Sequence, residues 1–291
     1  MSKKGILLIS AGHPYYGKYA YQLAVSIKHQ SPDVSISVIT EGNGLNHLYP
    51  EQKKIFDQII EADPKHYTSK TLGIRDVFKI KTSLYDLTPY DTTLYLDADM
   101  LWLPKKNVEQ LFDELKDIDF TMSNRGSMMI AFAPDDFIEW TKPSHLVDAY
   151  GFKDEMLYHL SSEFIYFKKT KDVKSLFDKT KKAFDYPKVN YKLFGNNQPD
   201  ELSFTIAMMQ SKVYPHTSPF YPAYWENAQR KNMQAHEMYK EYYLCSFGGA
   251  TSQQSVKTIY NNLAKYYLNN IGEVAFPLQD KNKFLPDRAV I

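Results

Sequence analysis

The chain has 291 residues, enough for one large α/β domain or two smaller ones with a substantial buried core. Charged residues make up 24% of it and its net charge is +1, which argues against a protein that coats nucleic acid through charge alone. The single cysteine, Cys245, excludes an internal disulfide framework and a zinc site built from several cysteines.

The same composition favours a particular compartment. One cysteine fits a reducing environment. Met1-Ser2-Lys3-Lys4 is followed by a short apolar run of strand length, which does not resemble a signal peptide. No stretch approaches the length of a membrane span. We therefore expect a cytoplasmic protein that is not inserted in a membrane.

The N-terminal residues predict the first unit of an α/β sheet. Residues 5–10 (GILLIS) form an apolar run of strand length, and Ala11-Gly12-His13-Pro14 predict a turn. Apolar residues at helical spacing then predict a helix over residues 15–28. Strand, small-residue turn and helix together are typical of nucleotide-binding sheets. The turn lacks the GxGxxG pattern, so it does not indicate a dinucleotide site.

Two more strands are predicted over residues 34–40 and 59–60, followed by a polar loop over residues 65–72. A helix is expected over residues 73–87. Arg75 and Lys79 are four residues apart, so they would share one face of that helix.

Residues 92–102 (TTLYLDADMLW) are the most informative stretch of the chain. The β-branched and apolar lead-in predicts a buried strand that ends in Asp97-Ala98-Asp99. Two carboxylates this close repel each other unless a cation or a proton lies between them, and a hard divalent ion with oxygen ligands is the simplest solution. A solvated turn is the alternative, but the apolar runs on both sides argue against it.

The rest of the chain continues as helices and strands. A helix with a lysine-rich outer face is expected over residues 168–185, where a solvated surface or a phosphate-rich partner would explain the charge. The other expected elements are helices over 108–115, 201–210 and 255–268, and strands over 119–124, 163–167 and 243–249.

The segment KIKTSLYDLTPYDTTLYLDADML resembles the GT-A-fold glycosyltransferases, and most closely the glycogenin-like family 8. The resemblance is specific over about residues 79–103. It implies an α/β GT-A fold with a mixed, mostly parallel central sheet. On this basis we expect a GT-A domain over residues 1–250 and a C-terminal helical extension over residues 251–291 packed on it.

The resemblance implies a metal site. In that family the two acids hold a manganese ion that bridges the diphosphate of a nucleotide sugar, so Asp97 and Asp99 would bind Mn²⁺ or Mg²⁺. Residues 243–249 resemble the closing strand of the family, but Ser246 stands where the family has a histidine. Either Ser246 or a displaced histidine (His216 or His236) replaces that ligand, or the two acids and the diphosphate suffice.

Further roles follow from the resemblance alone. Ser10, Ala11 and Gly12 would approach the base and ribose, with Tyr15 or Tyr16 stacking on the base. Arg75 and Lys79 would face the diphosphate.

Near the start of the helix expected over residues 201–210, Asp200 and Glu201 would lie beneath the reacting sugar as catalytic candidates. Capping of that helix is the alternative role of Asp200. Ser161-Ser162-Glu163 stands where the family has a small, backbone-binding motif, which is a departure from its pattern.

Three functions are compatible with these features. The first is metal-dependent transfer of a sugar from a nucleotide diphosphate donor, expected to be a UDP-sugar, to a hydroxyl of a saccharide or small molecule, with retention of configuration. The second is transfer to hydroxymethylated bases in DNA, suggested by the lysine-rich helix. The third is a metal-dependent nucleotide hydrolase or a sugar-nucleotide binding protein, in which Asp200 or Glu201 would be the base.

Overall fold

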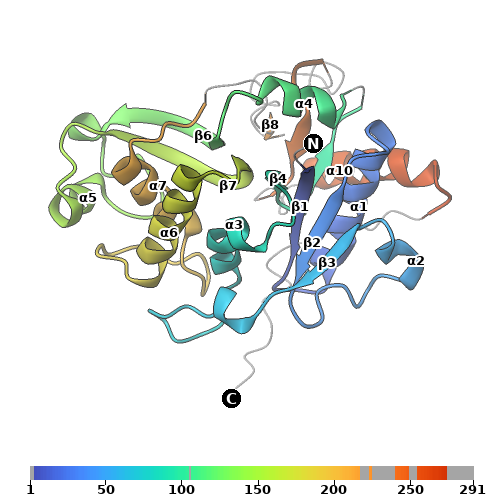
Figure 1. Ribbon diagram of the computed structural model, residues 1–291, viewed down its shortest axis with the longest axis horizontal. Helices are drawn as coiled ribbons and strands as arrows, with labels where there is room; N and C mark the ends of the chain where they lie inside the picture. The colour runs from blue at the N-terminus through green and yellow to red at the C-terminus, as the bar shows by residue number, and fades with distance from the viewer. Residues whose placement is uncertain (1–2, 105, 217–222, 225–239, 249–253, 274–291) are drawn as a thin grey trace. The chain divides into compact units, whose positions relative to one another are not determined.

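The computed structural model describes residues 3–104, 106–216, 223–224, 240–248 and 254–273 (Figure 1). The strands in these residues are β1 (Lys4–Ser10), β2 (Ile36–Thr40), β3 (Gln58–Glu61), β4 (Thr92–Leu96), β5 (Met100–Trp102), β6 (Phe120–Met129), β7 (Met156–Lys168), β8 (Ala223–Tyr224) and β9 (Leu244–Ser246). The α-helices are α1 (Tyr15–Gln30), α2 (Pro50–Lys53), α3 (Leu84–Leu87), α4 (Val108–Glu114), α5 (Pro143–Tyr150), α6 (Lys171–Asp185), α7 (Asp200–Ser211) and α10 (Gln254–Asn269). Short 3₁₀ helices are η1 (Pro64–His66), η2 (Val77–Ser83) and η3 (Ile130–Phe132).

The central sheet has six strands in the order β3-β2-β1-β4-β7-β6. Strand β7 is antiparallel to both of its neighbours, with Leu94 of β4 opposite Tyr166 and Met122 of β6 opposite Ile165. A smaller sheet has the order β5-β9-β8. The mixed, mostly parallel α/β sheet expected from the sequence is confirmed.

The chain divides into two compact units, which we describe separately. Unit 1 comprises residues 1–7, 60–96 and 116–218. In it α7 packs against α6 and β7, and the rings of Phe120, Phe177 and Phe204 meet in its core at centroid distances of 5.8–6.4 Å.

Unit 2 comprises residues 8–59, 97–115 and 219–291. Here α1 packs against β5 and α10. The hydroxyl of Tyr267 on α10 donates a 2.6 Å hydrogen bond to the carbonyl of Trp102 on β5, and Gln22 Nε2 on α1 donates to Tyr260 Oη at 2.6 Å. These buried polar contacts fix α10 against the strand that follows the two acids.

Several expectations about individual elements are confirmed and others are wrong. The strand expected at residues 92–96 and the helix starting at Tyr15 are present. The single helix expected over residues 73–87 is wrong, because Asp76 caps a 3₁₀ helix that starts at Val77, and only residues 84–87 are α-helical. Helices α2 and α5 had no counterpart in the expected elements.

Within the described residues, no helix combines the length and the apolar character needed to cross a membrane. The C-terminal extension starting at residue 251 stays a prediction, because residues 249–253 and 274–291 lie outside the described part of the chain.

Asp76 links two segments of unit 1. Its carboxylate accepts hydrogen bonds from Phe78 N at 3.1 Å and from Gln198 N at 2.7 Å, and so joins the start of η2 to the residues before α7. Gln198 continues the link by donating from Nε2 to Phe184 O at 2.6 Å. The Asp76 side chain is completely buried, and burial raises its pKa from 3.8 to about 6 despite these bonds.

We expect the Asp76 carboxyl to stabilise the fold more at low pH than at neutral pH, the opposite of most carboxyl groups. Because its pKa is higher in the folded state, its contribution to the free energy of unfolding is largest below pH 4 and falls by roughly 3 kcal/mol as the pH rises past 6. Urea titrations at pH 4 and pH 7 of wild type and Asp76→Asn, which does not titrate, measure this difference.

Asp63→Asn is the matched control, since Asp63 caps η1 by accepting from Lys65 N at 2.9 Å but is exposed. That hydrogen bond lowers the pKa of Asp63, so its contribution is present above pH 4 and is lost as the pH falls. Equal pH dependence of wild type and Asp76→Asn would show that Asp76 does not titrate with a raised pKa.

Candidate active site

Strands β4 and β5 hold the two acids in a tight turn. All five residues of β4 are buried, the chain turns at Asp97-Ala98-Asp99, and β5 follows at once. Strand β5 is antiparallel to β9, with Met100 opposite Ser246. Phe247 N donates to Asp99 O at 3.2 Å, so the backbone of Asp99 is fixed by the end of β9.

This register brings oxygen atoms together at Gly248. A methyl group added to Gly248 would lie 3.2 Å from Asp99 Oδ2, 3.5 Å from Asp99 Oδ1 and 3.5 Å from Ser246 Oγ. Both side chains are almost fully buried, with Asp99 at 4% and Ser246 at 2% exposure. Ser246 Oγ also accepts from Gly248 N at 3.3 Å. A side chain at position 248 would therefore crowd the Asp99 carboxylate and the Ser246 hydroxyl.

The residues in this place fit a hard cation. Carboxylate and hydroxyl oxygens are suitable ligands for Mg²⁺ and Mn²⁺. In the described part of the chain, no group of three His, Cys, Asp or Glu side chains converges in a way that could hold a metal. Of the three predicted ligands, Asp99 and Ser246 lie together at Gly248, whereas Asp97 begins the turn two residues earlier and its side chain is only partly buried. His236, one of the displaced histidines considered above, lies outside the described residues.

The turn after β1 is braced from within unit 2. Ser10 Oγ donates to Gly44 O at 2.7 Å, and Gly12 N donates to Glu41 Oε1 at 3.0 Å. Gly12 has φ +90°, which explains the glycine at that position. Ser10 is completely buried and Ala11 is 6% exposed, so their side chains shape the turn and do not reach far into solvent.

Tyr15 belongs to a cluster of rings at the start of α1. It stacks on His13 with centroids 5.5 Å apart, lies 5.6 Å from the His47 ring, and has Lys18 Nζ 4.6 Å from its centroid. Burial lowers the pKa of His13, and the neighbouring His47 lowers it further. A base that stacked on Tyr15 would have to share the ring with these neighbours.

Lys79 is engaged in a buried ion pair. Its Nζ lies 2.8 Å from Asp185 Oδ1 and donates to Thr68 O at 2.8 Å, and the two charged side chains are only 6% and 10% exposed. Arg75 precedes the 3₁₀ helix and forms an isolated bridge with Thr68, so the expected shared helix face of Arg75 and Lys79 is wrong. Use of Lys79 as a phosphate-binding cation would remove the charge that balances Asp185.

Lys81 was not among the expected site residues, although it lies near Asp200 and is linked through Ser162 to Glu201 at the start of α7. Its Nζ donates to Ser162 Oγ at 2.8 Å and lies 3.9 Å from Asp200 Oδ2. Ser162 Oγ in turn donates to Glu201 Oε1 at 3.1 Å. In a helix with three residues per turn, residues two apart face different directions, which separates Lys81 from Lys79. We call Lys81, Ser162, Asp200 and Glu201 the lysine–acid cluster.

The cluster collects residues from η2, β7 and α7. Ser162 and Asp200 are buried, and the Lys81 side chain is 12% exposed. Lys81 Nζ also lies 5.7 Å from the ring of Tyr95 on β4. Asp200 is the first residue of α7 and Pro199 is its N-cap, so Asp200 lies inside the helix, one residue later than a capping role requires. The predicted catalytic candidates, Asp200 and Glu201, therefore belong to one cluster with the partly buried Lys81.

Solved structures with a similar fold are glycosyltransferases. The chain aligns with the galactosyltransferase LgtC in complex with donor and acceptor sugar analogues, with a TM-score of 0.54 and 13% identity, over 90% of this chain and 95% of that one. This is the GT-A fold. An active-site mutant of LgtC gives a TM-score of 0.51 at 12% identity over 90% and 95% of the two chains.

The apo bifunctional glycosyltransferase WbbM shares the GT-A fold, with a TM-score of 0.53 and 13% identity. The match covers 85% of this chain and only 46% of the WbbM chain, so the chain spans about half the length of that protein. No protein-family model and no curated protein sequence matches the chain.

We expect Lys79 to stabilise the fold. Lys79→Met would leave Asp185 buried without its nearest cation, at a cost of about 3 kcal/mol in the free energy of unfolding. Urea denaturation measures this cost. Lys65→Met is the matched control, since Lys65 pairs with Asp63 at 3.4 Å on the surface and its loss should cost less than about 1 kcal/mol. A stable Lys79→Met protein that no longer bound nucleotide diphosphate would instead place Lys79 at the donor.

Proposed function

We propose that the protein is a metal-dependent glycosyltransferase that moves a sugar from a UDP-sugar to an acceptor hydroxyl, with retention of configuration. The observation that carries the proposal is the convergence of Asp99, Ser246 and Gly248 after β4 of a GT-A fold. The acceptor is a saccharide or a small molecule.

Asp97, Asp99 and Ser246 would hold the cation, Mn²⁺ or Mg²⁺. The bound ion would neutralise the diphosphate as the bond to the sugar breaks. Asp99 is fixed for this task by its backbone bond from Phe247 and by the pairing of β5 with β9. Ser246 supplies an oxygen where the resembled family has a nitrogen ligand, so the whole set consists of hard donors.

For the transfer itself we propose Glu201. A carboxylate can stabilise the positive charge that develops on the anomeric carbon in an oxocarbenium-like transition state. The bond from Ser162 Oγ orients Glu201, and Ser162 is in turn held by Lys81.

The two alternative functions receive less support from the residues described. On α6, Lys174 pairs with Asp178 at 2.8 Å, Lys181 pairs with Asp86, and Lys179 donates to Ser211 at 2.9 Å. Part of the positive charge that suggested DNA is therefore balanced within the protein. A nucleotide hydrolase would use the same metal and Glu201 as base, and it would release free sugar from the donor without any acceptor.

The proposed donor site should require a divalent metal. We expect UDP to bind only with Mn²⁺ or Mg²⁺. Asp99→Asn should weaken this binding by at least about 10–100-fold, which is the usual effect of losing a residue that only supports a metal ligand. Gly248→Ala should weaken it about tenfold, because the added methyl lies 3.2 Å from the Asp99 carboxylate. Calorimetric titrations of UDP with metal and with chelator measure both effects.

Gly126→Ala is the matched control for the added methyl group, since its nearest neighbour would be Phe137 at 3.9 Å, an ordinary contact. UDP binding that is indifferent to chelator and to Asp99→Asn would overturn the proposed donor site. Absence of binding by wild type would overturn the choice of nucleotide.

The proposed role of Glu201 should appear in kcat and not in KM. We expect Glu201→Gln to lower kcat about 10²–10³-fold while KM for the donor changes little, because the charge acts in the transition state. Steady-state kinetics with a UDP-sugar and an acceptor measure this split. Glu51→Gln, which alters an exposed ion pair with Lys54, should leave both parameters unchanged. Wild-type turnover by Glu201→Gln would exclude Glu201 from the reaction.

A further inference from the structure

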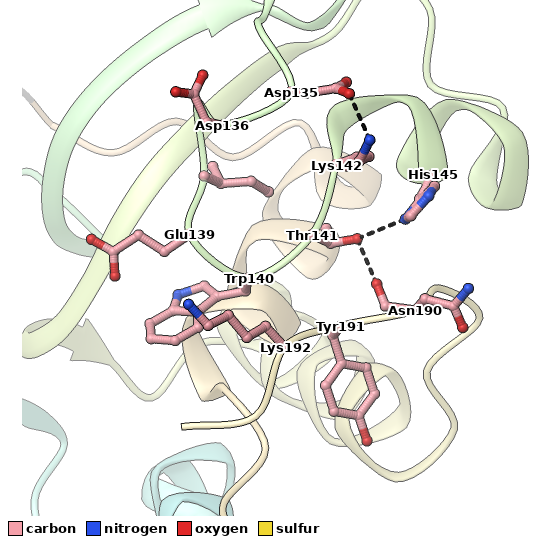
Figure 2. Close-up of a pocket in the computed structure, with 11 residues that line it drawn as sticks. Asp135, Asp136, Glu139, Trp140, Thr141, Lys142, His145, Asn190, Tyr191 and Lys192 are labelled. Atoms are coloured by element: carbon pink, nitrogen blue, oxygen red, sulfur yellow. Dashed lines mark hydrogen bonds and ion pairs between the residues drawn. The ribbon is translucent and has the colours of Figure 1, made fainter. Parts of the chain in front are cut away.

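Unit 1 contains a hollow of about 580 Å³ that the proposed chemistry does not use. It lies between the loop of residues 135–142, the start of α5 and the segment 190–192. Figure 2 shows Asp135, Asp136 and Lys142 at one end of it and Trp140 and Lys192 at the other. The hollow is shallow and widely open to solvent, and its volume falls within the range of about 300–1,000 Å³ that is usual for small-molecule sites.

Hydrogen bonds within unit 1 hold the walls of the hollow in place. Thr141 Oγ donates to Asn190 O at 2.6 Å and lies 3.3 Å from His145 Nδ1, as the dashed lines in Figure 2 mark. Lys192 N donates to Trp140 O at 2.8 Å. These bonds tie the loop, α5 and the segment 190–192 to one another, so a ligand would meet a preformed surface.

The floor of the hollow is part of an apolar core that includes α7. Ile138, which lines the hollow, belongs to the same buried cluster as Leu202 and Ile206 of α7. Trp140 and Tyr191 pack against this cluster and remain partly exposed. The hollow is therefore built on the helix that begins with Asp200 and Glu201.

The chemistry of the lining selects a class of ligand. It carries three carboxylates and two lysines, one of which, Lys142, pairs with Asp135 at 2.9 Å. This slightly acidic balance disfavours a nucleotide or another polyanion. An aromatic ring beside carboxylate, amide and ammonium groups suits a sugar, whose C–H face packs on the ring while its hydroxyls bond to the polar groups.

Glu139 connects the hollow to Arg125 and His159. It lines the hollow, and its Oε1 lies 3.4 Å from Arg125 Nη1 and 3.7 Å from His159 Nε2. Burial and the Arg125 charge lower the pKa of His159, and the charges of Glu139 and Glu201 both oppose this. The carboxylates of Glu139 and Glu201 therefore both lie near His159.

We infer that this hollow is a second, non-catalytic saccharide site, which holds a sugar unit of an oligosaccharide acceptor away from the reacting hydroxyl through Trp140, Asp136, Asn190 and Lys192. The identity of the ligand as an acceptor rests on the proposed function, whereas saccharide binding does not. An acceptor chain of several sugars would gain affinity from the hollow without a change in the chemical step.

Saccharide binding can be tested on the full chain without nucleotide or metal. We expect at least one of maltotriose, cellotriose, chitotriose and lactose to bind, as followed by saturation-transfer NMR and calorimetry. Trp140→Ala should weaken that binding about tenfold or more, and Trp140→Phe should retain most of it because a ring remains. Asn190→Trp, a change at an exposed position on the rim, should abolish binding by filling the hollow.

Two controls separate this inference from the proposed function. Phe132→Ala removes a ring that is 80% exposed and does not line the hollow, so saccharide binding should persist. Metal-dependent UDP binding should be unchanged in Trp140→Ala and Asn190→Trp. Failure of all four saccharides to bind, or binding indifferent to both substitutions, would overturn the site. Saccharide binding by wild type that is lost in Trp140→Ala and Asn190→Trp, together with no sugar transfer by wild type, would support the site and count against the transferase.

Discussion

The cost of burying carboxylates constrains this structure more than any other single factor. Asp76, Asp99, Asp185 and Asp200 are all less than a tenth exposed, and a buried carboxylate is stable only with compensating charge or hydrogen bonds. The chain meets this demand in different ways. Asp76 receives backbone amides, Asp185 receives Lys79 and Lys70, and Asp200 lies near Lys81. Asp99 lies beside the Ser246 hydroxyl and Gly248, where we propose that a cation binds.

These differences give two neighbouring lysines different partners. Lys79 and Lys81 are two residues apart on η2, yet one closes a buried pair with Asp185 and the other reaches Ser162 and the start of α7. The charge of Lys79 is balanced by Asp185. Lys81 instead donates to the hydroxyl of Ser162, which in turn donates to Glu201. A single 3₁₀ helix thus serves both the stability of unit 1 and the electrostatics of its acids.

The sequence was sufficient for features with strong local signals. The apolar run of residues 92–96 predicted a buried strand, and the structure confirms it. The metal site indicated by the two acids that follow the strand stays a prediction. The helix expected over residues 73–87 was wrong because the Asp76 side chain accepts from Phe78 N and starts a 3₁₀ helix at Val77. Lys81 was missed because helical spacing paired Arg75 with Lys79. The hollow at Trp140 was beyond prediction, since it depends on long-range contacts between the segments 135–145 and 190–192.

The position of Ser246, the hydroxyl of the proposed metal site, depends on contacts that extend into the core of unit 2. Ser246 is 2% exposed at the end of β9, and the next residue, Phe247, packs on Tyr260 of α10 at 5.0 Å. Tyr260 accepts from Gln22 of α1, and its pKa is raised chiefly by burial and also by the charges of Tyr19 and Asp99. The position of β9 therefore depends on α1 and α10 together. A short hydroxyl side chain can contribute to a cation site only if its backbone is placed accurately, because it has little reach of its own. The dense packing around Phe247 provides that placement, so the core of unit 2 is as much a part of the proposed metal site as the two acids are.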